Sequence, residues 1–173
     1  MKKSVLFTIA AIVLVLGLTS CGGSSVEETT KDAPAGRTEQ ADSEKFIFTY
    51  KGHEIYMGQD AAIIDSLGEY KEYTEEPSCA FEGVDKSYFY GSFYLVTGTL
   101  GGKEMVVNLW FVDDTVETAE GLCIGDGKDK VESLYGADGL SSANAYIYKK
   151  EHSALTVIME NDVVSSIQYS YEN

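Results

Sequence analysis

The sequence predicts an α+β fold of two tandem units that share one sheet, each unit a short helix followed by an antiparallel β-meander, with both helices on one face. One observation is a repeated pattern of an apolar residue, a glycine, a polar residue, a short helix and a further glycine, at Gly58 and again at Gly125. The other is that β-type runs follow each helix. Since a unit of about 65 residues buries only a small core, the two units are expected to combine.

The first unit, residues 45–113, contains two predicted hairpins. The β-type runs 46–50 and 53–57 are separated by a two-residue turn that contains glycine, which is typical of a hairpin. The runs 92–99 and 104–112 flank another glycine-containing turn.

Each predicted helix has a glycine at its end. In the first unit, Asp60 can cap a helix over 61–67 that Gly68 terminates. In the second unit, Gly136 terminates a helix over 128–135.

The second unit, residues 114–173, repeats the strand pattern. A short β-type run, 122–124, precedes its helix. The runs 153–159 and 163–169, on either side of a polar turn, predict its last hairpin.

The N-terminus, residues 1–20, has the features of a secretory signal. Lys2 and Lys3 precede an uncharged apolar run, 5–18, which is too short to span a hydrocarbon core of about 20 helical residues. The run ends in Leu18-Thr19-Ser20-Cys21, which resembles a bacterial lipobox. The alternatives are an ordinary signal peptide with a coincidental cysteine, or an uncleaved anchor.

The lipobox resemblance implies that Cys21 carries a thioether to diacylglycerol and becomes the first residue after cleavage. Two or more acyl chains hold a protein stably at a bilayer where one is marginal. The expected location is therefore the extracytoplasmic face of the cell membrane, with the membrane as a partner through this lipid.

Residues 21–44 are predicted to be a disordered tether. They are rich in Gly, Ser, Thr and acidic residues, and Val26 is their only large apolar residue. Such a tether reaches about 25 Å on average. The whole chain has a formal net charge of −15, which argues against a nucleic-acid partner and leaves the lipid, not electrostatics, to hold the protein at the membrane.

Two motifs point to known families. The helix-then-meander tandem resembles the β-lactamase-inhibitor-protein-like fold and the SmpA/OmlA lipoproteins of outer-membrane assembly. More closely, the stretch Glu76-Pro-Ser-Cys-Ala-Phe-Glu-Gly83 with Asp85-Lys86, and the later Glu120-Gly-Leu-Cys-Ile-Gly125, resemble an uncharacterised family of Gram-positive lipoproteins that carries a PSCAF motif. The likeness covers most of residues 46–170 and implies a binding fold.

Catalytic and metal-binding motifs are largely missing from the sequence. His53-Glu54 begins like a zinc HExxH motif, but the fifth position is Met57, and the other histidine, His152, is far along the chain. We therefore expect no metal, no cofactor and no enzymatic activity.

Two cysteines remain besides Cys21. In an exported protein Cys79 and Cys123 could form a disulfide that closes a loop of about 45 residues. The alternative is that both are buried thiols that pack as small hydrophobic groups. A catalytic cysteine is a third, minor option.

The strongest functional indication is the run 104–112, which is apolar on both faces. Strict alternation places Met105, Val107, Leu109 and Phe111 on one face and Val106, Asn108, Trp110 and Val112 on the other. By comparison with the second unit, Trp110 lies on the face that meets solvent. Tyr88, Tyr90 and Tyr94 on neighbouring strands are expected to join it.

An exposed Trp–Tyr cluster suits a binding surface, because aromatic side chains give a large contact area at little entropic cost. The alternative is that the tether, the loop around Cys79 or the other unit covers this face. The leading hypothesis is a non-catalytic, membrane-anchored binding module for a protein or cell-wall component. An inhibitor or sensor of an extracellular enzyme is the alternative, and an enzyme is the third.

The lipid anchor gives a direct prediction. Cells fed a palmitate analogue should label the wild-type protein, and Cys21→Ser should abolish the label because the serine hydroxyl does not form the thioether. A Cys79→Ser variant, which keeps the lipobox, is the matched control and should be labelled like the wild type. Equal labelling of the Cys21→Ser variant would refute the anchor.

Overall fold

A computed structural model of the chain describes residues 44–142 and 144–172. The predicted signal peptide with Cys21, and the tether apart from Glu44, lie outside these residues. All of the described residues belong to one compact unit. They fold mainly as antiparallel β-sheet with two short α-helices.

The described strands are β1 (Phe48–Tyr50), β2 (His53–Ile55), β3 (Glu72–Pro77), β4 (Glu82–Phe89), β5 (Phe93–Leu100), β6 (Lys103–Phe111), β7 (Leu140–Ser142), β8 (Ala145–Lys150), β9 (Ser153–Glu160) and β10 (Val163–Tyr171). The helices are α1 (Ile64–Leu67) and α2 (Lys128–Tyr135). Single 3₁₀ turns cover Ala61–Ile63 and Ala137–Gly139.

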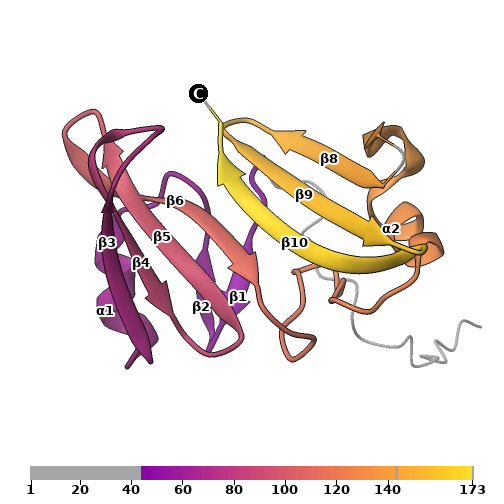
Figure 1. Cartoon of the computed structure of the whole chain (residues 1–173), viewed down its shortest axis with the longest axis horizontal. Coiled ribbons are helices and arrows are strands. Elements are labelled where there is room, and N and C mark those ends of the chain that lie inside the picture. Colours follow the sequence, from indigo (N-terminus) through magenta and orange to yellow (C-terminus); the bar gives the residue numbers. More distant parts are fainter. Residues whose placement is uncertain (1–43, 143, 173) are drawn as a thin grey trace, which may run out of the picture. The chain divides into compact units, whose positions relative to one another are not determined.

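Eight of the described strands form one sheet in the order β3-β4-β5-β6-β10-β9-β8-β7, with every pair antiparallel. Strands β3 to β6 are one four-stranded meander, and β7 to β10 are a second (Figure 1). The pairing of β6 with β10 joins them, with Leu109 opposite Tyr169. The antiparallel sheet of the sequence-based prediction is confirmed, and the sheet dominates the fold.

The turn and cap residues act as the sequence predicts. Lys51 and Gly52 have φ of 50° and 82° and connect β1 to β2, as a two-residue hairpin turn requires. The Asp60 side chain accepts a hydrogen bond of 2.9 Å from the Ala62 amide at the start of the first helical segment. Gly68, with φ of 84°, ends α1.

The predicted strand at 122–124 does not form, because these residues are irregular. Gly121 and Gly125 bracket the segment with φ of 91° and 95°. The Cys123 amide donates to the Asp126 carboxylate at 2.8 Å instead of to a neighbouring strand. The fully buried side chain of Leu122 explains the apolar pattern that resembled a strand.

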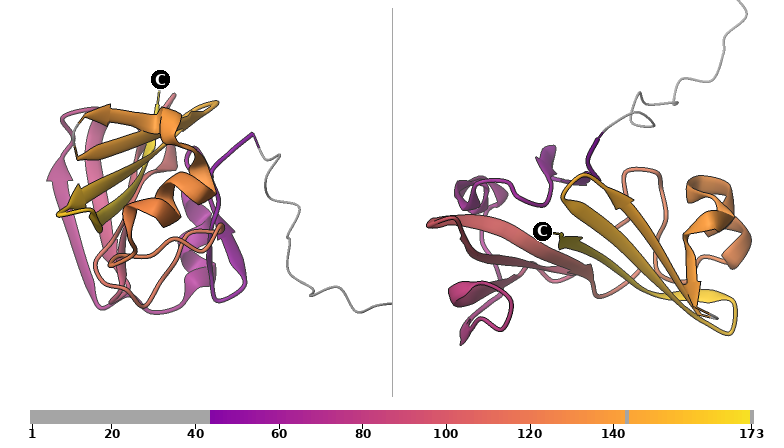
Figure 2. Two further views of the ribbon diagram at one scale, coloured as in Figure 1. Left: turned by 90° about the vertical axis from the view of Figure 1, so that its right-hand side faces the viewer. Right: turned by 90° about the horizontal axis from the view of Figure 1, so that it is seen from above.

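The hydrophobic core lies on one face of the sheet. Both helices contribute to it, with Leu67 and Val131 fully buried. The β1–β2 hairpin adds Phe48, whose ring contacts Phe93 at 5.0 Å between centroids. Figure 2 shows α1 and this hairpin on one face of strands β3 to β6, and the connection between β3 and β4 on the other face.

The predicted strict alternation of side chains between the two faces of β6 is wrong at one point along the strand. The pairing of β5 with β6 shifts register between Val96 and Thr97, which is a β-bulge. As a result Val106 joins Leu109 in the core, whereas Val107 lies with Trp110 along a groove on the opposite face. A bulge reverses the faces of all residues beyond it.

The residues at the junction of the two meanders should dominate stability. Leu109 is fully buried between Leu95 and Tyr169, so we expect Leu109→Ala to lower the free energy of unfolding by about 2–5 kcal/mol. The matched control is Val112→Ala, because Val112 is 46% exposed just after β6; it should change stability by less than about 0.5 kcal/mol. Denaturant unfolding followed by circular dichroism measures both, and equal effects would contradict the assignment of the core.

Candidate functional site

A row of aromatic side chains crosses the sheet on the face opposite the core. Phe89 of β4 stacks on Tyr94 of β5, with centroids 4.5 Å apart and planes 23° apart. Tyr94 stacks in turn on Trp110 of β6, at 4.8 Å and 17°. All three are half-buried. We call Phe89, Tyr94 and Trp110 the aromatic row.

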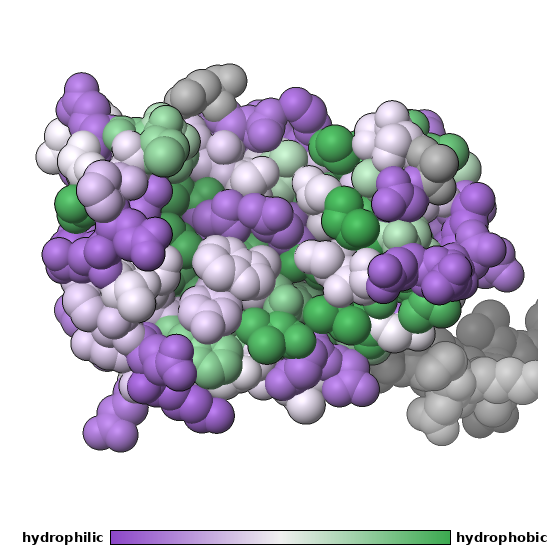
Figure 3. All heavy atoms as spheres, in the orientation of Figure 1, coloured by the Kyte–Doolittle hydropathy of each residue, from purple (hydrophilic) through white to green (hydrophobic). Residues whose placement is uncertain are grey.

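The surroundings of the aromatic row differ between its two ends. At one end the Lys71 ammonium lies 6.0 Å from the centre of the Phe89 ring. At the other end Trp110 pairs with Gln168 of β10. Figure 3 shows this face, on which apolar and weakly polar side chains gather in the middle around a strongly hydrophilic group, and hydrophilic side chains prevail around the rim.

Two of the four aromatic residues predicted for this surface lie elsewhere. Trp110 and Tyr94 are in the row, but Tyr88 and Tyr90 are buried in the core, 9% and 7% exposed. The reason is the β4–β5 turn, in which the Tyr90 amide donates to the Phe93 carbonyl at 3.0 Å. This register places Tyr88 opposite Leu95 and Phe89 opposite Tyr94.

Phe89 is the member that the sequence analysis missed. It lies between Tyr88 and Tyr90 at the end of β4, and successive side chains of a strand alternate between its faces, so Phe89 must lie on the opposite face from both. The alternation along β4 could have indicated that Phe89 lies on the face opposite the two tyrosines. Which of the two faces meets the core depends on the pairing of β4 with β5.

The connection between β3 and β4 folds onto the same face as the aromatic row. Pro77 ends β3, and the Ser78 hydroxyl then accepts a hydrogen bond of 2.9 Å from the Phe81 amide. The Ser78 amide donates to the Gly83 carbonyl at 3.1 Å, which closes the loop. We call residues 78–83 the PSCAF loop.

Gly98 of β5 gives the PSCAF loop room to pack. A Cβ atom at this position would lie 3.1 Å from the Phe81 ring, 3.0 Å from the Asp85 carboxylate and 3.3 Å from Val107. Glycine weakens a strand interior and often marks the close approach of another group. At Gly98 that group is the ring of Phe81 together with the Asp85 carboxylate.

A groove of about 430 Å³ lies between the PSCAF loop and the sheet. Its walls include Cys79, Phe81, Asp85, Asn108, Trp110 and Tyr171. Asp85 Oδ1 and Asn108 Oδ1 are buried, and neither has a hydrogen-bond partner among the described residues. Buried acceptors are normally paired, so these two oxygens are unusual.

The possible disulfide between Cys79 and Cys123 is not present, since both are free thiols. Cys79 is exposed in the PSCAF loop, so it is not the buried thiol of the alternative prediction either. The Cys123 thiol donates to the Asp126 carboxylate at 3.2 Å. Burial and this carboxylate raise the pKa of Cys123, which disfavours the reactive thiolate.

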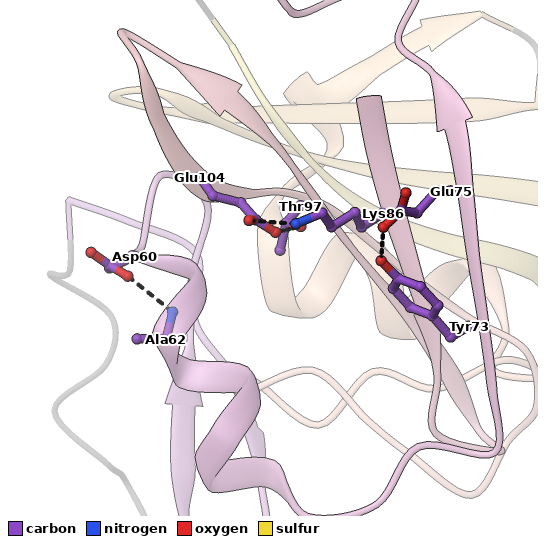
Figure 4. Close-up of polar contacts among 7 residues, drawn as sticks. All are labelled: Asp60, Ala62, Tyr73, Glu75, Lys86, Thr97 and Glu104. Atoms are coloured by element: carbon purple, nitrogen blue, oxygen red, sulfur yellow. Dashed lines mark hydrogen bonds and ion pairs between the residues drawn. The ribbon is translucent and has the colours of Figure 1, made fainter. Parts of the chain in front are cut away.

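A polar network occupies the core-facing side of the first meander. Glu104 of β6 accepts a hydrogen bond of 2.6 Å from the buried Thr97 hydroxyl and pairs with Lys86 at 2.8 Å (Figure 4). An open pocket of about 540 Å³ adjoins it, with Asp60 and Asp65 in its wall. Partial burial raises the pKa of Glu104, but the hydrogen bonds from Lys86 and Thr97 outweigh it and lower that pKa overall.

The two histidines lie in separate elements, His53 in β2 and His152 in the β8–β9 turn. Within residues 44–142 and 144–172, no three His, Cys, Asp or Glu side chains are placed to hold a metal ion. No helix in the same residues is long and apolar enough to cross a bilayer.

The groove beside Trp110 offers hydrogen-bond acceptors and aromatic rings to a ligand.

Comparison of the chain with protein families, with curated proteins and with solved structures finds no match.

The Glu104 network predicts a pH-dependent contribution to stability. A carboxylate whose pKa is lowered on folding stabilises the protein above its unfolded pKa of about 4.3, and this contribution disappears as the pH falls through the folded value. Glu104→Gln should therefore lower stability at pH 7, by less than about 1 kcal/mol because the pair is partly exposed. The difference from wild type should vanish in strong acid.

Denaturant unfolding at both pH values measures this effect. Glu160→Gln, at an exposed position at the end of β9, is the matched control and should show no such pH dependence. A Glu104→Gln deficit that persists unchanged in acid would contradict the network.

Proposed function

We propose that this protein is a non-catalytic binding module, anchored by lipid on Cys21 at the extracytoplasmic face of the cell membrane. The observation that carries the proposal is the aromatic row beside the groove. Phe89, Tyr94 and Trp110 are half-exposed on a sheet whose other face holds the core. Aromatic side chains concentrate binding energy at interfaces, and a rigid sheet fixes their positions before a partner arrives.

The lipid and the tether supply the location. The lipobox at Leu18–Cys21 supports an anchor, and the composition of 21–44 supports a flexible spacer. A tether of this kind lets the sheet face turn toward a protein or cell-wall partner instead of the bilayer.

The chemistry of the groove supports binding over catalysis. Its described walls contain no histidine, lysine or arginine that could activate a nucleophile such as Cys79. The other thiol, Cys123, is held protonated beside Asp126. The proposal therefore includes no reaction and no cofactor.

We further propose that residues 45–113 and 114–173 are two copies of one α+β unit. The support is the arrangement of elements: a short helix that ends at a glycine, followed by a four-stranded meander, occurs twice, and the sheet order reads symmetrically outward from the β6–β10 pair. The β1–β2 hairpin is specific to the first unit, which is consistent with the irregular 122–124 segment in the second.

The binding role is tested at Trp110. In intact cells that carry the full, anchored chain, chemical crosslinking should capture a partner, and Trp110→Ala should reduce the capture about tenfold or more. Because Trp110 is only half-buried and stacks on one ring, the variant should lose about 1–3 kcal/mol of stability and remain folded. Quantitative mass spectrometry of the captured material and thermal unfolding measure the two effects.

A matched control separates binding from general surface change. Val163 is 42% exposed at the start of β10, at the opposite end of that strand from the groove residue Tyr171. Val163→Ala should leave capture unchanged. Capture that is equal for wild type and Trp110→Ala would overturn the binding role of this face.

A further inference from the structure

We propose that the groove beside Trp110 receives an arginine side chain of a protein partner. This inference rests on the proposed function, because it names the chemistry that the binding face recognises. The relevant side chains are Asp85, Asn108 and Trp110, which line one groove. A guanidinium group is planar, carries five N–H donors and one positive charge, and stacks on aromatic rings.

Two hydrogen-bond acceptors in the groove are unsatisfied. Asp85 Oδ1 and Asn108 Oδ1 are inaccessible to solvent and lack a donor among the described residues. A buried acceptor without a donor costs free energy, and a carboxylate oxygen costs more than a neutral one. A ligand that brings several donors into the groove relieves this cost with small side-chain movements, whereas an apolar ligand leaves it in place.

The charge of the groove suits a cation. The ionisable carboxylates in the groove wall are Asp85 and Glu76, and none of the described residues that line it is basic. Lys86, the neighbour of Asp85, points to the other face and is paired with Glu104 at 2.8 Å. The carboxylates of the groove are therefore able to pair with a cation of a ligand.

Aromatic rings form part of the groove wall. Tyr94 covers one face of the Trp110 indole at 4.8 Å, and Phe81 and Tyr171 approach each other at 6.5 Å across the groove wall. Aromatic rings attract a cation near their faces, and arginine is the commoner partner in such contacts. Two separate acceptors beside an aromatic surface match the forked donors of arginine better than the compact ammonium of lysine.

Trp110 is the only tryptophan of the chain, so its fluorescence reports directly on this groove. The full chain in neutral detergent is titrated with the peptide acetyl-Gly-Arg-Gly-amide and with its citrulline counterpart, which has the same shape without the charge. We expect the Trp110 fluorescence to change saturably with the arginine peptide. The citrulline peptide should bind at least about tenfold more weakly. The lysine peptide should also bind more weakly than the arginine peptide.

Variants locate the binding. Asp85→Asn should weaken binding of the arginine peptide about tenfold. The matched control, Asp114→Asn, removes the same charge from an exposed residue outside the groove wall and should have no effect. Asn108→Ala, which removes the second acceptor, should also weaken binding of the arginine peptide, and it keeps the test decisive if Asp85→Asn unfolds.

The outcomes separate the two proposals. Equal affinity for the arginine and citrulline peptides, or equal loss with Asp85→Asn and Asp114→Asn, overturns the guanidinium site. A lysine peptide that binds as tightly as the arginine peptide does the same. If the peptide fails while Trp110→Ala still reduces partner capture in cells, only this inference is lost; if both fail, the binding role is lost with it.

Discussion

The pairing of β6 with β10 is the contact on which the rest of the structure depends. Among the described residues it is the one place where the two meanders exchange backbone hydrogen bonds, with Leu109 opposite Tyr169 and Trp110 opposite Gln168. On the inner face this pairing brings Leu109, Tyr169 and Ile167 into a single core, where each is at most 1% exposed. Because a four-stranded meander buries little apolar surface alone, joining the two meanders into one sheet lets both short helices cover a common core.

Because the core lies on one face of the sheet, the aromatic side chains on the outer face are not needed to form it. The core already receives Leu95 and Leu109 from the central strands, so the aromatic row of Phe89, Tyr94 and Trp110 is additional apolar surface. Stacked cross-strand pairs of this kind contribute about 0.5–1.5 kcal/mol each. They also hold one another in place, so in the proposed binding role these side chains have little conformational freedom left to lose.

Local features of this fold were predictable from the sequence, and features set by pairing between distant segments were not. The turn at Lys51-Gly52 and the cap at Asp60 depend on the conformational preferences of one or two residues, and both were predicted. The bulge between Val96 and Thr97 has no local signal, since it is a property of two strands together. The same limit explains why Tyr88 and Tyr90 were wrongly expected beside Trp110: the face that they occupy follows from the register of β4 with β5. The sequence identified the PSCAF motif without showing that its loop folds over the sheet beside Trp110.

Gly98 shows why the groove is a feature of its own and not a by-product of the sheet. Glycine in a strand interior costs stability relative to a β-branched residue. The position needs no unusual backbone conformation, because Gly98 is not among the glycines with positive φ. What it provides is space for Phe81 and for the Asp85 carboxylate, at 3.1 and 3.0 Å from where a Cβ would lie. The carboxylate that occupies this space has an oxygen without a described partner. A weakened strand and an unsatisfied acceptor in contact with each other are two local costs at one place. Such departures from local consistency are expected at functional sites, where binding of a ligand offsets what folding alone does not.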